Sequence, residues 1–429
     1  MTRGHRRTHG LGQMRPISFI IIPSARLERF PVHYGWIIVI ACLIIGVAGY
    51  GTYFCFTLFY SHLVAELSWS RSVVSGAMSL GLVTYGLFAL PMGWCADRFG
   101  PRRTVLVGGG LFGLGTALGA FITEAWQLYA LYGGLSAVGI GSVWAPLVAT
   151  VSRWFDASRR GTAIGIAVLG SGSGIFFMAP LAEVLIAQLG WRDAYIWLGV
   201  IAGSVIILSA LFLTRNPAER GVLPYGATPH SSQNTAPETP LPSISSFARS
   251  PLFWRMCLSF GLWWFAAAIA YIQIAPYMLE KGFTSSVAAA IVTLYGGGNC
   301  IGRIVMGRLC DTLGPQQSYR LSLVISTLAM AALAWHDGFT SIAITAAILG
   351  FGIGGASTQI TTVSIDLFGT AAAGVLMGTV LAIIGLLGAG GPLASGAIHD
   401  ATLSYTPAVY MGAAVFLAAI ILSFGLQRK

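Results

Sequence analysis

The sequence predicts an all-α integral membrane protein with twelve membrane-spanning helices. Only 9% of its 429 residues are charged, whereas 55% are hydrophobic. A soluble protein carries about 25% charged residues, because its surface must be wetted. Glycine is also frequent, at 55 residues, as is typical of closely packed transmembrane helices. These observations exclude a soluble enzyme, a nucleic-acid-binding protein and a disordered protein.

Each predicted helix is a run of roughly 20 mainly apolar residues, which is the length needed to cross a bilayer. The first six runs cover residues 36–60, 72–93, 104–122, 127–151, 161–187 and 194–214. The last six cover residues 251–279, 285–306, 318–335, 340–364, 372–398 and 406–427. Residues 1–35 precede them, and we expect this basic tail to lie in the cytoplasm.

Residues 215–250, between the sixth and seventh helices, have a different composition. They are rich in Pro, Ser and Thr without a long aliphatic run, which predicts a polar linker. The chain repeats itself on either side of this linker, since Gly93 to Pro101 returns as Gly307 to Pro315. We therefore predict two six-helix bundles, residues 36–214 and 251–429. Parallel repeats of this kind are typical of transporters, whose substrate site lies between the halves.

The basic residues indicate the orientation, because Lys and Arg concentrate in cytoplasmic loops. If the N-terminus is cytoplasmic, the opposite side holds only Arg71, Arg192 and Lys281. The cytoplasmic loops then hold the other arginines, among them Arg98, Arg102, Arg103, Arg153, Arg159, Arg160, Arg215, Arg220 and Arg308. We predict that both termini are cytoplasmic.

The loop between the second and third helices contains a motif with a specific spacing. It runs Gly93-x-x-x-Asp97-Arg98-x-Gly100-x-Arg102-Arg103, with a degraded copy at Gly307 to Gly314. This motif resembles the loop signature of the major facilitator superfamily, and the resemblance covers the chain from His33 to Leu426. Shorter motifs resemble the bacterial monocarboxylate and oxalate/formate antiporter branch: His33-Tyr34-Gly35-Trp36, Pro146 to Phe155, and Asn299-x-x-Gly302-Arg303-x-x-x-Gly307. The resemblance implies the major facilitator fold and a bacterial inner-membrane protein.

The loop charges are candidate gating residues. Asp97 lies near the end of the second helix, where its carboxylate can pair with Arg98, Arg102 or helix-terminal amides. Together with Arg103, these groups could form a latch that holds one face closed and releases in the other state. Asp311 is the matching position of the second half, but Thr312 follows it instead of an arginine. The alternative is that these charges are simply solvated at the interface.

Arg303 is the basic residue placed well inside a predicted helix. A central arginine costs about 2.5–3.5 kcal/mol on insertion scales, so it indicates a cavity or a partner. Tyr295, Asn299 and Arg303 follow at four-residue spacing and share one helix face. A guanidinium group there suits a carboxylate; the alternative is that Arg303 extends to the headgroups near Gly307. In the resembled monocarboxylate transporters, an arginine at this place is implied to bind the substrate carboxylate.

Other candidate substrate contacts are polar or aromatic residues on the helices expected to line the pathway. Each one alone is more often a packing or interfacial residue. They are Tyr50, Tyr53 and Phe54 on the first helix, Trp144 on the fourth, Gln273 on the seventh and Gln359 on the tenth.

Two departures from the family that the chain resembles narrow the range of expected substrates. Oxalate-type antiporters are expected to carry a lysine on the eleventh helix, but residues 374–398 contain neither Lys nor Arg. A single cation suits one carboxylate, so oxalate is disfavoured. Animal-type carriers place an aspartate four residues before the arginine, where this chain has Asn299, and that route to proton symport is therefore missing.

The sequence thus predicts a secondary active carrier of small organic anions, most of all monocarboxylates, working by alternating access. Its expected partners are the bilayer, a small carboxylate, and H⁺ or a counter-transported anion; we expect a monomer with no nucleic acid, cofactor or metal. No catalytic motif stands out, so an enzyme is not predicted. The alternatives are an efflux pump for amphipathic drugs and a non-transporting membrane sensor.

Overall fold

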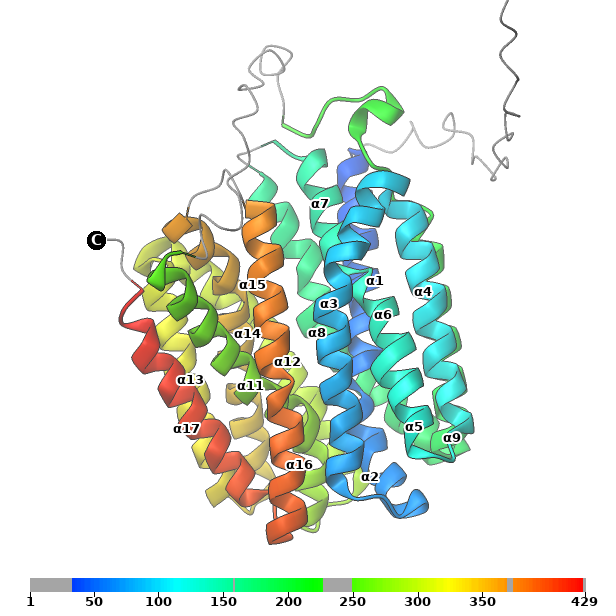
Figure 1. The fold of residues 1–429 in the computed structure, drawn as a ribbon, viewed down its shortest axis with the longest axis vertical. Coiled ribbons are helices and arrows are strands. Elements are labelled where there is room, and N and C mark those ends of the chain that lie inside the picture. The colour runs from blue at the N-terminus through cyan, green and yellow to red at the C-terminus, as the bar shows by residue number, and fades with distance from the viewer. Residues whose placement is uncertain (1–32, 157–158, 227–248, 369–372, 427–429) are drawn as a thin grey trace, which may run out of the picture.

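The computed structural model describes residues 33–156, 159–226, 249–368 and 373–426. The predicted basic tail, residues 1–35, falls almost wholly outside this part, as do residues 227–248 of the linker. The regular secondary structure of the described residues is helical, apart from one isolated bridge between Phe155 and Tyr225. Figure 1 shows the helices standing side by side with the linker at one end. We call this the linker end, and the end near α2 and α16 the far end.

The described residues contain twelve helical spans that are long and apolar enough to cross a membrane, which confirms the predicted number. The first six are formed by α1 (Tyr34–Phe54) with α2 (Phe56–Leu67), α3 (Arg71–Phe99), α4 (Pro101–Leu118) with η2 (Gly119–Phe121), α5 (Ala125–Leu128) with η3 (Tyr129–Ser136), α6 (Ala137–Gly141) and α7 (Trp144–Trp154), α8 (Arg160–Leu189), and α9 (Trp191–Ala210). The last six are α11 (Pro251–Glu280), α12 (Ser285–Leu313), α13 (Pro315–Trp335), α14 (Phe339–Phe368), α15 (Ala373–Gly388) with α16 (Gly390–Thr402), and α17 (Thr406–Ser423).

The spans differ from the predicted ranges at most of their ends, and three of them continue through local irregularities. The first span extends to Leu67 through an irregular turn at Cys55. The fourth span contains the π-helical segment η3, and the eleventh bends at Ala389. As a result, His399 and Asp400, which lie beyond the predicted range 372–398, belong to the last turn of α16.

The repeated loop motif has a backbone cause. Gly100 ends α3 with φ +90°, and Gly314 ends α12 with φ +82°. Residues with a Cβ avoid this left-handed region, so glycine allows the turn at each site. Pro101 and Pro315 then begin the following helices, a position where the missing N–H costs no helical hydrogen bond. The two halves therefore turn in the same way at matching positions.

The first part of the linker, residues 215–226, packs against the N-terminal half rather than standing free as a polar connection. It contains the short helix η4 (Pro217–Arg220). Tyr225 donates its backbone N–H to Trp154 O at 2.8 Å, and Asp156 N donates to Tyr225 O at 3.1 Å. His33 Nε2 lies 3.0 Å from Leu223 O. This segment therefore ties the end of α7 to the start of α1.

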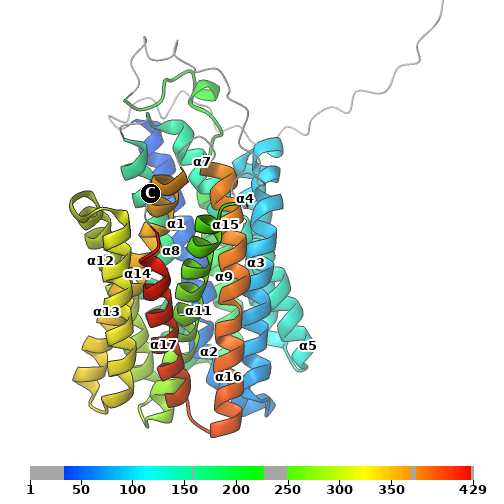
Figure 2. The ribbon, with the colours of Figure 1, turned by 60° about the vertical axis from the view of Figure 1, so that its left-hand side comes forward.

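The two halves meet along several helices, seen from two sides in Figures 1 and 2. α8 packs against α12, and α3 packs against α15 and α16. Glycines allow close approach within each half: a Cβ on Gly170 would overlap the α1 backbone, and one on Gly302 would overlap the α14 backbone. Small residues of this kind let transmembrane helices approach closely.

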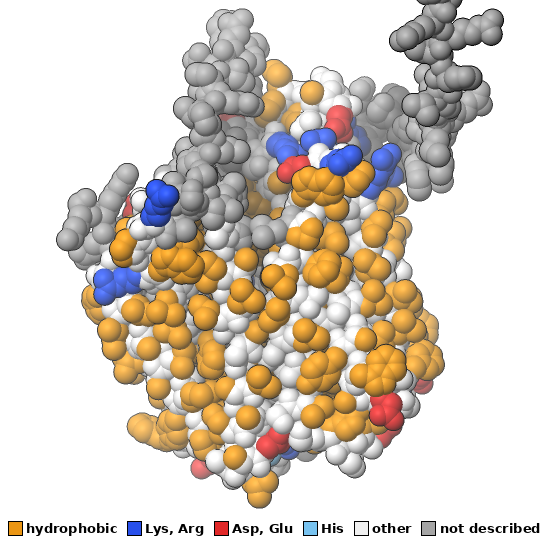
Figure 3. Space-filling view, viewed as in Figure 1, with side chains coloured by type: hydrophobic (Ala, Val, Ile, Leu, Met, Phe, Trp, Pro, Cys, Tyr) orange, Lys and Arg blue, Asp and Glu red, His pale blue; other side chains and the backbone are white. Residues whose placement is uncertain are grey.

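The flank of the molecule is apolar and the charges lie near its ends, as Figure 3 shows for one face. Large apolar side chains stand outward on the described flank, such as Leu328, exposed to 66%, and Trp335, exposed to 75%. Such a surface suits lipid rather than water. Arg71, Arg192 and Lys281 lie at the far end, because they stand where α3 and α9 begin and α11 ends. The structure is that of a multi-pass membrane protein.

Candidate functional site

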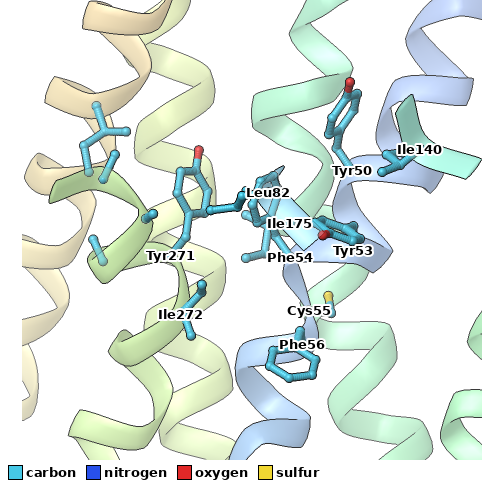
Figure 4. Close-up of a cluster of buried hydrophobic side chains, with 14 of the residues drawn as sticks. Tyr50, Tyr53, Phe54, Cys55, Phe56, Leu82, Ile140, Ile175, Tyr271 and Ile272 are labelled. Carbon is cyan, nitrogen blue, oxygen red and sulfur yellow. The ribbon is translucent and has the colours of Figure 1, made fainter. Parts of the chain in front are cut away.

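A cavity of about 120 Å³ lies between the two halves. Nineteen described residues line it, and they come from both halves. Figure 4 shows Tyr50 and Tyr53 of α1 on one side and Tyr271 of α11 on the other. Eight lining residues are aromatic: Tyr50, Tyr53, Phe54, Tyr85, Trp144, Trp263, Trp264 and Tyr271. Polar hydroxyls come from Ser171, Ser357 and Thr361, and a positive charge comes from Arg303.

Arg303 projects from α12 and turns back along its own helix. Its Nε donates to Asn299 Oδ1 at 3.1 Å, one turn earlier. The same amide group donates from Nδ2 to the Tyr271 hydroxyl at 3.0 Å. The side chain therefore points away from Gly307, opposite to the direction in which an arginine would extend to the headgroups at the linker end. Asn299 holds the guanidinium and the phenol in a fixed relation to each other.

No carboxylate neutralises Arg303 among the described side chains. The ion pairs found there join Arg153 to Asp97, Arg192 to Glu66, Lys281 to Asp337 and His399 to Glu280. The described residues that line the cavity include no Asp or Glu. A charge held in an apolar interior without a counter-ion is costly. The site is therefore suited to an anion that enters from outside the protein.

Gly172 on α8 makes room for this arrangement. A Cβ at Gly172 would overlap Arg303 Nε and Asn299 Oδ1. Gly170 and Gly174, on the opposite face of α8, instead approach the backbone of α1. Arg303 thus lies against the N-terminal half at a point where that half carries no side chain.

At the far end the two halves are joined by hydrogen bonds. Thr57 Oγ1 donates to Ile272 O at 2.7 Å, and Gln273 Nε2 donates to Ser75 Oγ at 3.1 Å. The Asp400 carboxylate accepts from the backbone N–H groups of Arg71 and Ser72. These bonds link α2 and α3 to α11 and α16. The cavity is therefore closed toward the far end in this structure.

Twelve spans, a repeated glycine turn and a cavity between two packed halves are the features of one transporter fold. The family model described as Major Facilitator Superfamily matches residues 41–392 and 267–429. The chain belongs to the major facilitator superfamily. Membership agrees with the resemblance inferred from the loop motif.

Curated relatives extend this match over most of the chain. Monocarboxylate transporter 13 of Rattus norvegicus is 29% identical over 392 residues, covering 90% of this chain and 87% of the relative. Monocarboxylate transporter 11 of Homo sapiens is 28% identical over 409 residues, covering 92% of this chain and 83% of the relative. Both are transporters, in agreement with the predicted function class.

Solved structures support the major facilitator fold. A bacterial homolog to the human lysosomal transporter Spinster, crystallised inward-facing and unoccupied, gives a TM-score of 0.65 at 16% identity, covering 92% of this chain and 95% of its own. The E. coli fucose:proton symporter gives 0.63 at 16% identity, covering 92% of this chain and all of its own. At this identity the similarity bears on the fold alone.

The predicted substrate contacts divide into two sets in this major facilitator protein. Arg303, Tyr50, Tyr53 and Trp144 line the cavity, and so does Phe54. Asn299 and Tyr295 are fully buried and lie behind it. Asn299 orients Arg303, whereas Tyr295 packs edge-on against Tyr271 with ring centroids 5.2 Å apart.

The two glutamines, also predicted as substrate contacts, do not line this cavity. Gln273 is exposed to only 2% and bridges Ser75 and Ser395 at 3.1 and 2.9 Å. Gln359 is fully buried and donates to Met306 O at 3.0 Å. Both amides donate hydrogen bonds inside the helix packing, and Gln273 Oε1 is buried without a hydrogen-bond partner among the described residues.

Sequence reasoning missed Trp263, Trp264, Tyr271 and Tyr85. The first three lie on α11, and Trp264 and Tyr271 are seven residues apart, which places them on one helix face. That spacing could have indicated that both rings face the same cavity. Tyr85 could not be found in the same way, because its neighbour in the site, Tyr50, is on another helix. The hydroxyl oxygens of the two tyrosines are 3.1 Å apart.

The superfamily loop does not pair as the sequence suggested. Asp97 Oδ1 accepts from Arg153 Nη2 of α7 at 2.7 Å, not from Arg98 or Arg102. The Arg98 guanidinium lies over the Trp94 ring, 5.2 Å from its centroid. Arg102 is partly buried and Arg103 exposed, and the side chain of Asp311 lies outside the described part. The bond joins the second and fourth spans because both end at the linker end.

Proposed function

We propose that this major facilitator protein is a secondary active transporter of monocarboxylates that works by alternating access. The observation that carries the proposal is Arg303: it lines a cavity between the halves, and no carboxylate of the described residues neutralises it. The relatives named as monocarboxylate transporters support the same substrate class.

The chemistry of the cavity favours one carboxylate. A guanidinium group presents several N–H donors in a plane, and a carboxylate accepts two of them in parallel. Nε is already bonded to Asn299, so the terminal nitrogens are the donors that face a ligand. α15 lines the cavity with Met377, Leu381, Ile384 and Gly385 and adds no cation. A dicarboxylate would therefore place its second charge against apolar side chains.

Alternating access follows from the way the halves meet. The hydrogen bonds between the halves lie at the far end, beyond the cavity. Breaking them while closing the linker end would expose the same cavity to the other side. A bound carboxylate would neutralise Arg303, which removes the cost of an isolated charge during that rearrangement. Since the chain carries no nucleotide-binding motif, we expect a gradient of H⁺ or of a second anion to drive the cycle.

We place the linker end in the cytoplasm, because most of the loop arginines lie there and positive residues stay inside. This orientation makes the far end the outer side. A bacterial inner membrane is the location implied by the sequence motifs, and the monomeric state is our expectation.

An efflux pump for amphipathic drugs is the competing function, and the aromatic lining of the cavity favours it. Both functions are tested by ligand binding to the purified protein in detergent. A monocarboxylate should stabilise the wild type against thermal unfolding and should not stabilise Arg303→Ala. Arg308→Ala, an exposed arginine on the same helix, is the matched control. If Arg303→Ala binds the carboxylate as tightly as wild type, the anion-carrier function is wrong.

A further inference from the structure

We propose that the site selects monocarboxylates with a flat aromatic body over short-chain acids such as propionate. This inference rests on the proposed function and names the substrate class within it. It is carried by the size of the cavity, by the nature of its walls and by the scarcity of free polar groups.

The cavity is larger than a short-chain acid requires. Its volume of about 120 Å³ is on the order of ten times the volume that one water molecule needs by the same kind of measure. An acid of four to six heavy atoms, held at Arg303, would leave water against the apolar walls. An acid with a ring and a short chain would displace that water, and displacing poorly held water by an apolar group strengthens binding.

The walls are built from two aromatic groups. On one side Tyr50 stands edge-on to Tyr85 and Trp144, with ring centroids 6.1 and 6.3 Å away. On the other side Tyr271 stacks on Phe54 at 4.5 Å and lies 5.8 Å from Trp264. Arg303 lines the same cavity. An aromatic ligand can make stacked or edge-to-face contacts with such walls, which are stronger than its apolar area alone would give.

Few polar groups in the cavity could form a hydrogen bond with a second polar substituent of the ligand. Of the three Ser and Thr hydroxyls in the lining, those of Ser171 and Ser357 donate to Val168 O and Gly354 O of their own helices, at 2.8 and 2.7 Å, which leaves that of Thr361. The described lining has no Asp or Glu to receive an ammonium group. An aromatic amino acid would therefore bury its ammonium without a carboxylate partner, and we expect the site to disfavour it.

Four ligands that differ by one group each test this inference by titration calorimetry on the full-length protein. They are 3-phenylpropionate, propionate without the ring, phenylalanine with an added ammonium, and 3-phenylpropionamide without the charge. We expect 3-phenylpropionate to bind at least tenfold more tightly than each of the other three. Equal binding of propionate and 3-phenylpropionate, or no binding of either, overturns the inference.

The outcomes separate this inference from the proposed function. If propionate binds as well as 3-phenylpropionate, the aromatic preference is wrong while a carboxylate carrier stands. If 3-phenylpropionamide binds as well as the acid, the carboxylate function itself is wrong. Phenylalanine binding equal to that of 3-phenylpropionate contradicts the exclusion of the ammonium group.

A variant assigns the preference to the aromatic wall. Trp264→Leu should reduce the ratio of 3-phenylpropionate to propionate affinity by at least threefold, whereas Trp335→Leu, on the exposed flank of α13, should leave the ratio unchanged. Folding is checked by gel filtration and circular dichroism. If Trp264→Leu does not fold, Trp264→Phe, which keeps a smaller ring, should lower the ratio less. An unchanged ratio in a folded wall variant contradicts the role of Trp264.

Discussion

Asp400, near the end of α16, caps the first turn of α3 in the opposite half of the molecule. Its Oδ1 accepts from Arg71 N at 3.0 Å and its Oδ2 from Ser72 N at 2.9 Å. These N–H groups begin a helix and have no partner within it, and the helix dipole favours a negative charge there. Arg71 also donates to the Tyr405 hydroxyl at 2.8 Å. One carboxylate thus joins the halves where the cavity is closed.

Removing this cap should open the far end. Replacing an acceptor at a helix N-terminus by Ala costs about 0.5–2 kcal/mol, so Asp400→Ala should shift the equilibrium between the two access states by about that amount. Spin labels at the exposed positions Ala65 and Leu403, in a background without native cysteines, report the separation of the halves. We expect longer distances in Asp400→Ala. Asp337→Ala, which removes an exposed acid of the same end that pairs within one half, should not change them.

Gly172 should be needed for the position of Arg303. In Gly172→Ala, the new methyl group would occupy the space of Arg303 Nε and Asn299 Oδ1, so the guanidinium must move although its charge remains. We expect carboxylate affinity to fall about tenfold, which corresponds to about 1.4 kcal/mol. Calorimetry measures the loss. Gly165→Ala is the control on the same helix, because its Cβ would meet no atom within 4 Å.

The geometry of the guanidinium should matter beyond its charge. Arg303→Lys keeps a cation but loses the planar pair of donors, so binding of a monocarboxylate should weaken strongly. Asn299→Ala leaves the arginine in place without its orienting bond and should cost about 1–2 kcal/mol of binding free energy. The carboxylate affinities of the two variants and of wild type are compared at several pH values. Wild-type affinity in Arg303→Lys would show that the site recognises charge alone.

Asp97 and Arg153 should affect the rate of transport more than the stability of the protein. The side chains are exposed to 61% and 33%, and exposed ion pairs contribute about 0–1 kcal/mol to stability. Asp97→Asn and Arg153→Gln should therefore accumulate normally in the membrane but turn over more slowly. The charge-reversed pair Asp97→Arg with Arg153→Asp should recover part of the rate. Uptake at wild-type rate in Asp97→Asn would remove this pair from the gating mechanism.

The orientation can be tested with reporters. Because loop arginines gather at the linker end, a reporter inserted between residues 227 and 248 should give a cytoplasmic signal, as should one fused after Lys429. A reporter inserted after Gly282, in the turn that follows α11 at the far end, should give the opposite signal. A periplasmic signal from either of the first two fusions contradicts the proposed orientation.

The spans of this protein were predictable because each depends on local composition. A run of apolar residues must leave water wherever it is placed, and the Gly–Pro turns at Gly100 and Gly314 depend on backbone conformation at a single residue. The loop motif predicts Asp97 as one half of a candidate latch, but it does not predict which arginine pairs with Asp97. Asp97 pairs with Arg153, 56 residues away on another span.

What each polar residue does within its helix depended on helix rotation. The four-residue spacing of Tyr295, Asn299 and Arg303 places them on one face, but it does not say which of them reaches the cavity. Arg303 does so because its long side chain turns back over Gly172, while Asn299 stays behind it. Gln273 has the same chemistry as a substrate contact, yet its face meets Ser75 and Ser395 instead.

The sequence by itself determined the membrane class, the number of spans, the repeated halves and the importance of one intramembrane arginine. These follow from hydrophobicity, turn chemistry and the cost of a buried charge, which act at or near single positions. The tertiary structure alone decided which aromatic rings form the cavity wall and which side of the cavity is closed. Those features depend on contacts such as Phe54 with Tyr271 and Asp400 with Arg71, and residues so far apart in the chain meet only when both halves have packed together.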